Sequence, residues 1–524
     1  MEKFYIATAI DYVNAPPHIG HAYEKIASDV IYRHFKQRGV SSYFLTGTDE
    51  HGIKIQKSAL DKGIDPQAFC DEIVEKFKNE WALLDVKYDR FIRTTEKDHE
   101  NVVQHIFKTL FNKGDIYKAS YTGLYCAGCE CFLNERELDQ NGFCPDHKAK
   151  PQEIMEENYF FRLSKYKNKI IEHIKANPRF IMPDYRVNEV LNQLKDIEDI
   201  SVSRSKESVS WGIPVPDDES QVIYVWIDAL SNYLTGVGYL NNDELFKKFW
   251  SANIHMIGKD ILKFHSIYWI GILMAMEIEL PETIYAHGWI TVDQSKMSKS
   301  LGNVIAPNAI LTAYQLESPD ALRYFLMTTT PFGRDGNYSD EDFKNKVNAD
   351  LANNLGNLLN RTLTMLVKYF DGNILPEAIT SSENNNQADM TEKTVLSVIE
   401  NFNDYEISNA AENIIKLVDN ANKYVNEQAP WALAKEEETK LQCAQVLYNV
   451  LETLRQVSVL IYPFTPNISR EMWVQLGQED NLSDVLLSDL KWGGLKEGKI
   501  TSAEQVKPVF LRMDSELAGD KKKK

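Results

Sequence analysis

The sequence predicts an α/β protein with a parallel sheet of the Rossmann type, an insertion that divides this sheet domain, and an all-α helical bundle after it. Three observations indicate this fold class. Strand and helix patterns alternate from the N-terminus, four of the six cysteines lie between Cys126 and Cys144, and strand patterns stop near Asn345. The 524 residues are enough for about three or four domains.

The first elements form a strand–helix–strand unit. Strands are predicted at residues 4–8 and 40–46, and the helix between them at 19–37, before Gly39. The helix carries an apolar stripe, formed by Ala22, Ile26, Val30 and Phe35. Strands joined in this way pair in parallel, so ligands are expected at their carboxyl ends.

A similar pattern returns after residue 220, where we expect the second half of the same sheet. Its strands are predicted at 221–227, 253–257 and 283–292, and its helices at 229–234 and 261–276.

Helical patterns dominate from residue 345 to Trp473. A helix at 350–370 places leucines on one face and Asn357 and Arg361 on the other. Residues 381–389 form a polar loop, and the chain from about Glu497 is weakly patterned. The four lysines that end it are a solvated tail or, as the less favoured alternative, an electrostatic contact for RNA.

Composition excludes several classes of protein. A net charge of −18 argues against a general nucleic-acid coat, so we expect no DNA partner and only local contacts with any RNA. No apolar run is long enough to span a membrane. The first residues lack the layout of a signal or transit peptide, so a cytoplasmic location is expected.

Two histidines stand where the first helix opens. His18 and His21 flank Gly20 at a position where helices usually carry Ser, Thr, Asp or Asn. Free backbone N–H groups and the helix dipole favour phosphate there, and Gly20 lets a ligand approach the backbone. The pattern alone leaves capping histidines, a phosphate site and, least favoured, a zinc site as alternatives.

A second polar stretch, Lys296-Met297-Ser298-Lys299-Ser300, follows the last predicted strand. Taken alone, it is most simply a solvated basic loop. Its two lysines also suit a mobile clamp on a triphosphate, because lysine is a compact charge on a flexible stem. The two stretches together are far more specific than either one.

The cysteine cluster has the spacing of a zinc site. Cys126-x₂-Cys129 and Cys144-x₂-His147 supply two pairs of ligands for tetrahedral zinc, with Cys131 as a bystander. This spacing favours zinc over unmetallated cysteines. Four protein ligands would leave no open position, so the metal would be structural.

The motifs H-I-G-H at 18–21 and K-M-S-K-S at 296–300 resemble the signatures of the class I aminoacyl-tRNA synthetases. The segments TAIDYVNAPPHIGHAYE, FLTGTDEHG, YVWIDALSNY, IGKDILKFHSIYW and KMSKSLGNVI are similar to those of the methionyl-tRNA synthetase family. The resemblance implies activation of L-methionine with ATP and Mg²⁺, then transfer to tRNA(Met) with release of AMP and pyrophosphate. Catalysis would rest on positioning and electrostatics, without a covalent enzyme intermediate.

The resemblance also implies residue roles. It assigns catalysis to His18, His21, Lys296 and Lys299, and ATP binding to His18, Gly20, His21, Glu24, Gly258, Asp260, Ile290 and Lys299. It assigns methionine binding to Ile10, Asp49, Trp226, Ala229, Tyr233, Ile261 and His265, and anticodon binding to Asn357, Arg361 and Trp431. Asp49 would hold the substrate ammonium, and the aromatic and aliphatic residues would enclose the thioether. The alternatives are ordinary core residues, a solvated helix face and a tryptophan packed on the bundle.

One physical limit concerns homocysteine, which lacks only the terminal methyl of methionine. A difference of this size gives about 1–3 kcal/mol of discrimination in an apolar pocket, which is too little. We therefore expect the enzyme to destroy activated homocysteine, and to do so in the synthetic site, because the chain is too short for a large separate editing domain.

With these assignments the chain divides into six parts. Residues 1–116 and 221–292 are the two catalytic halves, 117–220 the zinc-bearing insertion, 293–345 the KMSKS loop and stem-contact region, 346–495 the anticodon-binding domain and 496–524 the tail. The chain ends without the extra domain that some members use to dimerise, so a monomer is expected. Rival interpretations are a cysteine-specific enzyme of the same class and a non-catalytic RNA-binding paralogue.

Overall fold

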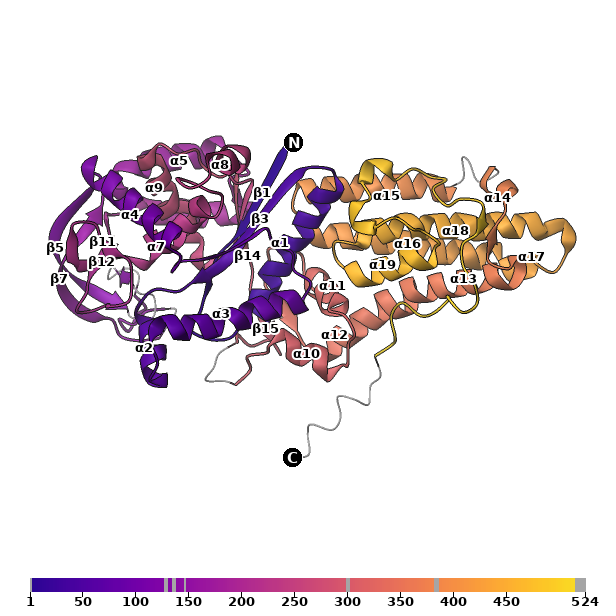
Figure 1. The fold of residues 1–524 in the computed structure, drawn as a ribbon, viewed down its shortest axis with the longest axis horizontal. Coiled ribbons are helices and arrows are strands. Elements are labelled where there is room, and N and C mark those ends of the chain that lie inside the picture. The colour runs from indigo at the N-terminus through magenta and orange to yellow at the C-terminus, as the bar shows by residue number, and fades with distance from the viewer. Residues whose placement is uncertain are drawn as a thin grey trace, which may run out of the picture.

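The computed structural model describes residues 2–126, 131–133, 138–145, 148–297, 302–380 and 386–513. An α/β half and a helical half lie end to end, with the central sheet and helix α1 between them (Figure 1). Within the described residues, no helix is long and apolar enough to cross a membrane.

The main sheet is parallel throughout, as predicted. Its order is β2-β3-β1-β13-β14-β8, with β4 also paired to β3. Its strands are β1 (Lys3–Thr8), β2 (Asp11–Tyr12), β3 (Ser41–Asp49), β4 (Arg90–Arg93), β8 (Ile181–Met182), β13 (Ile254–Gly258) and β14 (Thr283–His287). Alternate residues of β1 enter hydrophobic clusters on opposite faces, so helices cover both sides of the sheet.

The first helix, α1 (Ile19–Gln37), has the predicted bounds. Its apolar stripe packs on the sheet, and Gly39 follows it at a φ of 73°, in the left-handed region that glycine adopts without strain. The other helices of this half are α2 (Ile53–Lys62), α3 (Pro66–Leu83), α4 (Lys97–Asn112), α7 (Val225–Thr235), α8 (Asp243–Phe249) and α9 (Ile270–Met276).

The insertion is built mainly from antiparallel strands. One sheet has the order β6-β5-β7-β9, with β5 (Ile116–Cys126), β6 (Cys131–Leu133), β7 (Gln152–Phe161) and β9 (Ile200–Ser201). Two helices follow β7, namely α5 (Lys167–Ala176) and α6 (Val187–Lys195). Strand β8 also comes from this interval, so the insertion contributes an edge strand to the main sheet.

The strand predicted at 221–227 is confirmed only as far as Ile223, and it does not belong to the main sheet. Residues up to Ile223 form β12 (Asp218–Ile223), which pairs antiparallel with β10 (Ser203–Ser205) and β11 (Pro214–Val215), and helix α7 begins at Val225. A short run of apolar residues suits a buried strand and a buried helix equally, so periodicity could not separate the two. The strand predicted at 283–292 is two strands, because β15 (Ile290–Val292) leaves the sheet and pairs with β16 (Gly336–Tyr338).

The helix predicted at 261–276 is also interrupted. Residues Phe264–Trp269 are π-helical before α9 begins. The ring of His265 contacts the carbonyl of Ile261, and the Ser266 hydroxyl donates to that of Leu262. These side chains compete for the carbonyls four residues back, which accounts for the change in helix type.

The helical half begins after α10 (Pro307–Ala313), α11 (Asp320–Thr328) and α12 (Asp340–Val347). It contains a π-helical turn at Asn348–Gly356, then α13 (Asn357–Phe370), α14 (Pro376–Thr380), α15 (Asn386–Asn403), α16 (Ile407–Gln428), α17 (Pro430–Leu433), α18 (Lys440–Ile461) and α19 (Pro466–Gln475). The leucines of the predicted stripe are buried, at Leu351, Leu355, Leu358, Leu359, Leu363 and Leu366. Helix α15 begins inside the polar loop predicted at 381–389.

The weakly patterned segment after residue 496 is attached to the helical half over its described length. Strand β18 (Gly498–Lys499) pairs antiparallel with β17 (Asn373–Ile374), and Asn348 exchanges two hydrogen bonds with the backbone of Met513. These bonds hold the segment on the bundle. The four terminal lysines lie outside the described residues.

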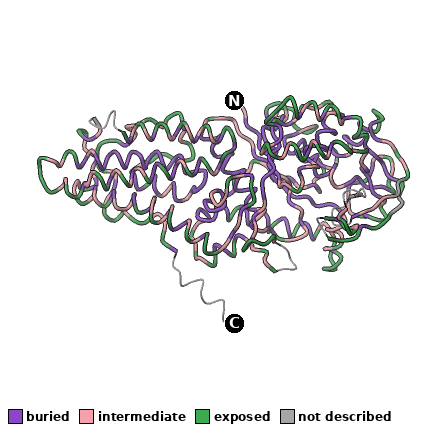
Figure 2. Tube along the Cα trace, turned by 180° about the vertical axis from the view of Figure 1, so that it is seen from behind, coloured by how far each residue is buried: buried purple, intermediate pink, exposed green. Residues whose placement is uncertain are grey.

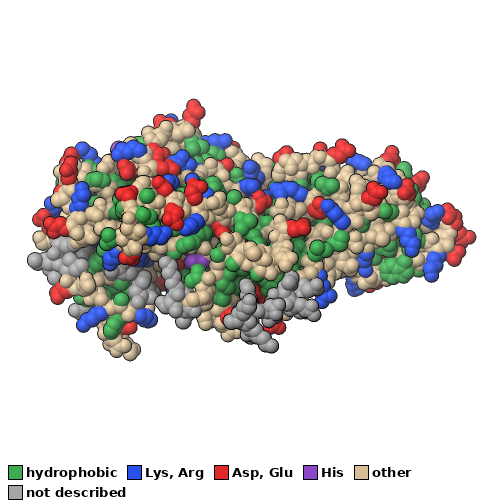
Figure 3. Space-filling view, turned by 60° about the horizontal axis from the view of Figure 1, so that its bottom comes forward, with side chains coloured by type: hydrophobic (Ala, Val, Ile, Leu, Met, Phe, Trp, Pro, Cys, Tyr) green, Lys and Arg blue, Asp and Glu red, His purple; other side chains and the backbone are tan. Residues whose placement is uncertain are grey.

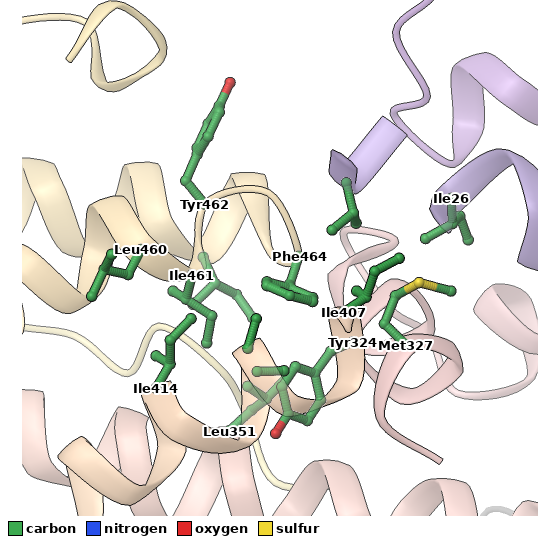
Figure 4. Close-up of a cluster of buried hydrophobic side chains, with 14 of the residues drawn as sticks. Ile26, Tyr324, Met327, Leu351, Ile407, Ile414, Leu460, Ile461, Tyr462 and Phe464 are labelled. Carbon is green, nitrogen blue, oxygen red and sulfur yellow. The ribbon is translucent and has the colours of Figure 1, made fainter. Parts of the chain in front are cut away.

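The two halves share one continuous hydrophobic cluster. Figure 4 shows Ile26 of α1 and Met327 of α11 beside Ile407 of α16 and Phe464, which follows α18. Buried residues run through the sheet and along the inward faces of the long helices (Figure 2). The halves therefore pack against each other through a common core.

A buried ionic cluster lies at the same joint. Asp29 of α1 accepts from Arg33 Nε at 2.7 Å and from Arg323 Nη2 of α11 at 2.6 Å, and both Asp29 and Arg323 are fully buried. Arg323 also donates to the carbonyls of Pro463 and Phe464, and Arg33 to the Tyr462 hydroxyl. Helix α1 is thus tied to the helical half by the Asp29 cluster, and also by Gln37, whose Nε2 donates to the carbonyl of Val459 on α18 at 3.0 Å.

Replacing Asp29 with alanine should be strongly destabilising. Arg323 would be left without its buried counter-charge and Arg33 would keep only Asp85, at 3.4 Å, so we expect the free energy of unfolding to fall by about 3–5 kcal/mol in urea denaturation. Glu412→Ala is the control, because its pair with Lys416 is exposed and should contribute less than about 1 kcal/mol. An equal fall in the free energy of unfolding in the two variants would contradict a stabilising role for the cluster around Asp29.

Candidate active site

One cavity opens at the carboxyl ends of β1, β13 and β14, beside the N-terminus of α1. Ten predicted site residues line it: Ile10, His18, Gly20, His21, Glu24, Gly258, Asp260, Ile261, Ile290 and Lys296. Histidine surface is visible in a recess of the face shown in Figure 3, where positive and negative side chains are interspersed. The fold thus brings together residues from four separate stretches of sequence.

The two histidines cap α1. The backbone N–H of Gly20 donates to His18 Nδ1, and that of His18 donates to His21 Nδ1, both at 3.1 Å. Burial lowers the pKa of His18 to about 4, and burial together with His18 lowers that of His21. Both rings are therefore neutral near pH 7. Since each Nδ1 is an acceptor, the proton sits on Nε2, where it can be donated to an anion.

Gly20 keeps the mouth of this site open. A Cβ at this position would lie 2.9 Å from His18 Cε1 and 3.4 Å from Met297 Cε. A side chain would therefore displace the His18 imidazole. Lys296 lies nearby with Nζ 3.7 Å from the centre of the Trp289 ring, while Lys299 lies outside the described residues.

A buried ionic group lies against the cavity wall, and of its residues only Glu24 was predicted from the sequence. Lys25 is fully buried, and its Nζ donates to Ala9 O at 2.9 Å, Asp11 Oδ1 at 2.9 Å and Glu24 Oε1 at 2.7 Å. Burial would lower the pKa of Lys25, but Asp11 and Glu24 outweigh it and raise that pKa. The second Glu24 oxygen lies 3.1 Å from His287 Nε2.

The sequence gives only a weak indication of this ionic group. Lys25, Asp29 and Arg33 recur every four residues on one side of α1, next to the apolar stripe. Charges in that position indicate buried pairs, although they do not identify partners from distant segments.

The predicted methionine residues fall partly outside the cavity. Trp226, Ala229 and Tyr233 lie on α7, and the Tyr233 hydroxyl donates to His265 Nε2 at 2.7 Å. His265 Nδ1 donates to the carbonyl of Ile261, which lines the cavity, and burial lowers the pKa of His265 to about 4. Trp226 stacks on Phe264 with ring centres 3.7 Å apart. These residues form a neutral, largely aromatic wall behind Ile261.

Asp49 approaches the cavity from the other side. It ends β3, and its backbone pairs with Tyr12 of β2, a residue of the cavity wall. Asp49 itself is buried, with 8% of its surface exposed. Asp49 therefore lies beside Tyr12 of the cavity wall, whereas the aromatic residues of α7 lie behind Ile261.

The three residues assigned to the anticodon lie on the helical half. Asn357 is exposed on α13, and Trp431 on α17 is 44% exposed. Arg361 donates to Asn426 Oδ1 at 3.2 Å and to Asn422 Oδ1 at 3.0 Å, both on α16. The two asparagines were not predicted, and they hold the guanidinium at the seam between α13 and α16.

Two of the four predicted zinc ligands are described. Cys126 ends β5 and Cys144 lies in a turn closed by its own backbone with Ala149 and Lys148, and both residues are buried. Cys129 and His147 lie outside the described residues. Among the residues that are described, no three His, Cys, Asp or Glu side chains group as metal ligands.

Family models match most of the chain. The model described as tRNA synthetases class I (M) matches residues 4–154 and 147–363, and the model of the anticodon-binding domain of tRNA ligase matches residues 388–505. The two models therefore correspond to the α/β half and to much of the helical half.

Individual relatives are similar over nearly all of it. The methionine–tRNA ligase of Caldanaerobacter subterraneus subsp. tengcongensis is 46% identical over 100% of this chain and 81% of its own length. That of Clostridium perfringens is 46% identical over 98% and 79%. The Mycobacterium tuberculosis methionyl-tRNA synthetase in complex with methionyl-adenylate superposes with a TM-score of 0.90 at 38% identity, covering 98% of this chain and 100% of that one. Its apo form gives 0.83 at 35% identity, covering 98% and 99%.

Proposed function

The chain belongs to the class I tRNA synthetases, among the methionine–tRNA ligases, and we propose that its residues activate methionine with ATP in the cavity beside α1. The observation that carries this proposal is the pair of neutral histidine caps at the N-terminus of α1, which line the same cavity as Lys296. The M. tuberculosis relative binds methionyl-adenylate, the product of that step.

In this mechanism, the chain positions the reactants and stabilises developing charge. The Nε2–H groups of His18 and His21 donate to ATP phosphate oxygens at the positive end of the helix dipole. Lys296 and Lys299 hold the α-phosphate during attack by the methionine carboxylate, and the departing pyrophosphate. Glu24, Gly258, Asp260 and Ile290 surround the adenosine. Mg²⁺ accompanies ATP and offsets phosphate charge.

We propose that methionine lies between Asp49 and the aromatic wall on α7. Asp49 holds the ammonium group, while Trp226, Tyr233 and the neutral His265 enclose the thioether. Transfer to tRNA(Met) would depend on anticodon recognition by Asn357, Arg361 and Trp431, with a base stacked on the exposed indole. A monomer located in the cytoplasm stays a prediction.

The direct test is methionine-dependent exchange of pyrophosphate into ATP. The unchanged chain should show exchange with methionine, and activity with a different amino acid instead would overturn the assignment.

A second prediction concerns Lys299. Lys299→Ala should slow exchange by about 10²–10³-fold, since it removes charge stabilisation in the transition state, while methionine affinity stays nearly unchanged. Lys423→Ala, at an exposed position on α16, should change neither the exchange rate nor the methionine affinity. Equal losses of rate and methionine affinity in Lys299→Ala would contradict the clamp role.

We also propose that the same site destroys activated homocysteine. The thiol of bound homocysteine lies within reach of its own activated carbonyl, and attack there would close a thiolactone ring and release AMP. With homocysteine and ATP, the enzyme should therefore produce AMP in large excess over active sites, as measured by chromatography. Accumulation of stable homocysteinyl-adenylate would disprove this editing.

For the insertion, we propose one structural zinc held by Cys126, Cys129, Cys144 and His147. Burial of the two described cysteines fits the metal, because thiolates inside a small lobe need a cation. When bound, zinc would fix the ends of the knuckles relative to each other. Metal analysis should give one zinc per chain, and Cys126→Ala should lose it, whereas Cys131→Ala should keep it. Full zinc content in Cys126→Ala would rule out this site.

A further inference from the structure

Three buried residues outside the cavity form one hydrogen-bonded chain. His51 Nδ1 lies 2.6 Å from Asp228 Oδ2, and His99 Nε2 lies 2.8 Å from Asp228 Oδ1. At most 4% of the surface of any of the three is exposed. The far nitrogen of His99 lies 3.1 Å from the Thr235 hydroxyl. Both oxygens of the carboxylate are thus bound by imidazoles, and the mechanism above uses none of the three residues.

The charges of Asp228 and His51 depend on their contacts with each other. Burial would raise the pKa of Asp228, but His51 and His99 outweigh it and lower that pKa. Burial would lower the pKa of His51, whereas Asp228 raises it. An ionised carboxylate between two histidines is therefore favoured, and the same contact favours the protonated form of His51. Such a pair is strong only while both members are present.

The positions of His51, Asp228 and His99 in the fold indicate what their hydrogen bonds do. His51 lies two residues after Asp49, at the end of β3, and Asp228 lies on α7 between Trp226 and Tyr233. We propose that methionine lies between Asp49, the last residue of β3, and the aromatic wall of α7, so His51, two residues beyond β3, and Asp228 stand close in sequence to both. His51 and Asp228 join them directly, and His99 of α4 fixes Asp228 from behind.

Glu50, between Asp49 and His51, is clamped as well. Its carboxylate receives two hydrogen bonds from Arg93, at 2.7 and 2.9 Å, and its carbonyl accepts from Trp211 Nε1 at 2.6 Å. Thr48 and Thr95 also donate to the carboxylate. The backbone that carries Asp49 is therefore immobilised on its C-terminal side by two successive anchors.

We propose that His51, Asp228 and His99 are positioning residues that set the distance between Asp49 and the aromatic wall of α7, and thereby the affinity for methionine. The inference rests on the proposed function, because it takes the methionine site to lie between these elements. The three residues touch no substrate and act through Asp49 and Tyr233. ATP binds against α1, β13 and β14, which this chain of hydrogen bonds does not join.

Asp228→Asn tests this role, since asparagine keeps the size of the side chain and removes its charge. We expect the KM for methionine in pyrophosphate exchange to rise by about 10- to 100-fold, the cost of misplaced binding groups, while the KM for ATP changes less than about twofold. Asp115→Asn is the matched control: it neutralises another buried carboxylate, one bonded to Lys165 and Tyr166, and should leave both KM values unchanged.

A milder variant keeps the inference testable if Asp228→Asn fails to fold. Thr235→Val removes the outer hydrogen bond to His99, together with the bond from Thr235 to the Ser231 carbonyl within α7, and should raise the KM for methionine by about two- to fivefold. Thermal unfolding and circular dichroism establish that each variant is folded. Equal rises in both KM values, or an unchanged KM for methionine in the folded variants, would overturn the proposal. Absence of exchange in the unchanged chain would instead refute the proposed function.

Discussion

The carboxylate of Asp29 is the interaction on which the arrangement of the molecule depends. It is buried where α1, α11 and the link between α18 and α19 meet, and it neutralises two guanidinium groups at once. Buried charges require close partners, so these elements can pack only in the geometry that satisfies the pair. The hydrophobic cluster around Ile26 and Phe464 supplies the packing, while the ionic contacts fix the orientation.

Helix α1 transmits that orientation to the site. Its C-terminal half is held by Asp29, by Arg33 and by the stacking of His34 on Phe402 at 3.8 Å, and its N-terminus carries the histidine caps. A helix of this length spans about 28 Å. The placement of the N-terminus of α1 relative to β13 and β14 is therefore determined partly by contacts with the helical half.

Sequence patterns predicted α1 to both ends, because its apolar period and Gly39 agree, and they predicted most strands of the sheet. They failed at residues 224–227, where an apolar run without a period was assigned to a strand, although the helix predicted at 229–234 lies within α7. The cavity could be predicted from the motifs at 18–21 and 296–300, because the two motifs occur together in one enzyme family. Lys25, Asp11 and His287 could not be predicted, since their role depends on partners that only the tertiary fold brings together. The π-helical turn at Phe264–Trp269 likewise follows from side-chain contacts rather than from propensity.

The two histidine caps of α1 determine how the hydrogen-bond donors of the site respond to the pH of the solvent. An aspartate cap accepts from the helix N–H groups but offers no donor, whereas a serine hydroxyl has to accept and donate at the same oxygen. An imidazole does both, since one nitrogen accepts from the backbone and the other keeps its proton. His18 would take up a second proton only near its pKa of about 4. In the free protein, acidification from pH 7 to pH 6 therefore leaves the Nε2–H donors of His18 and His21 unchanged.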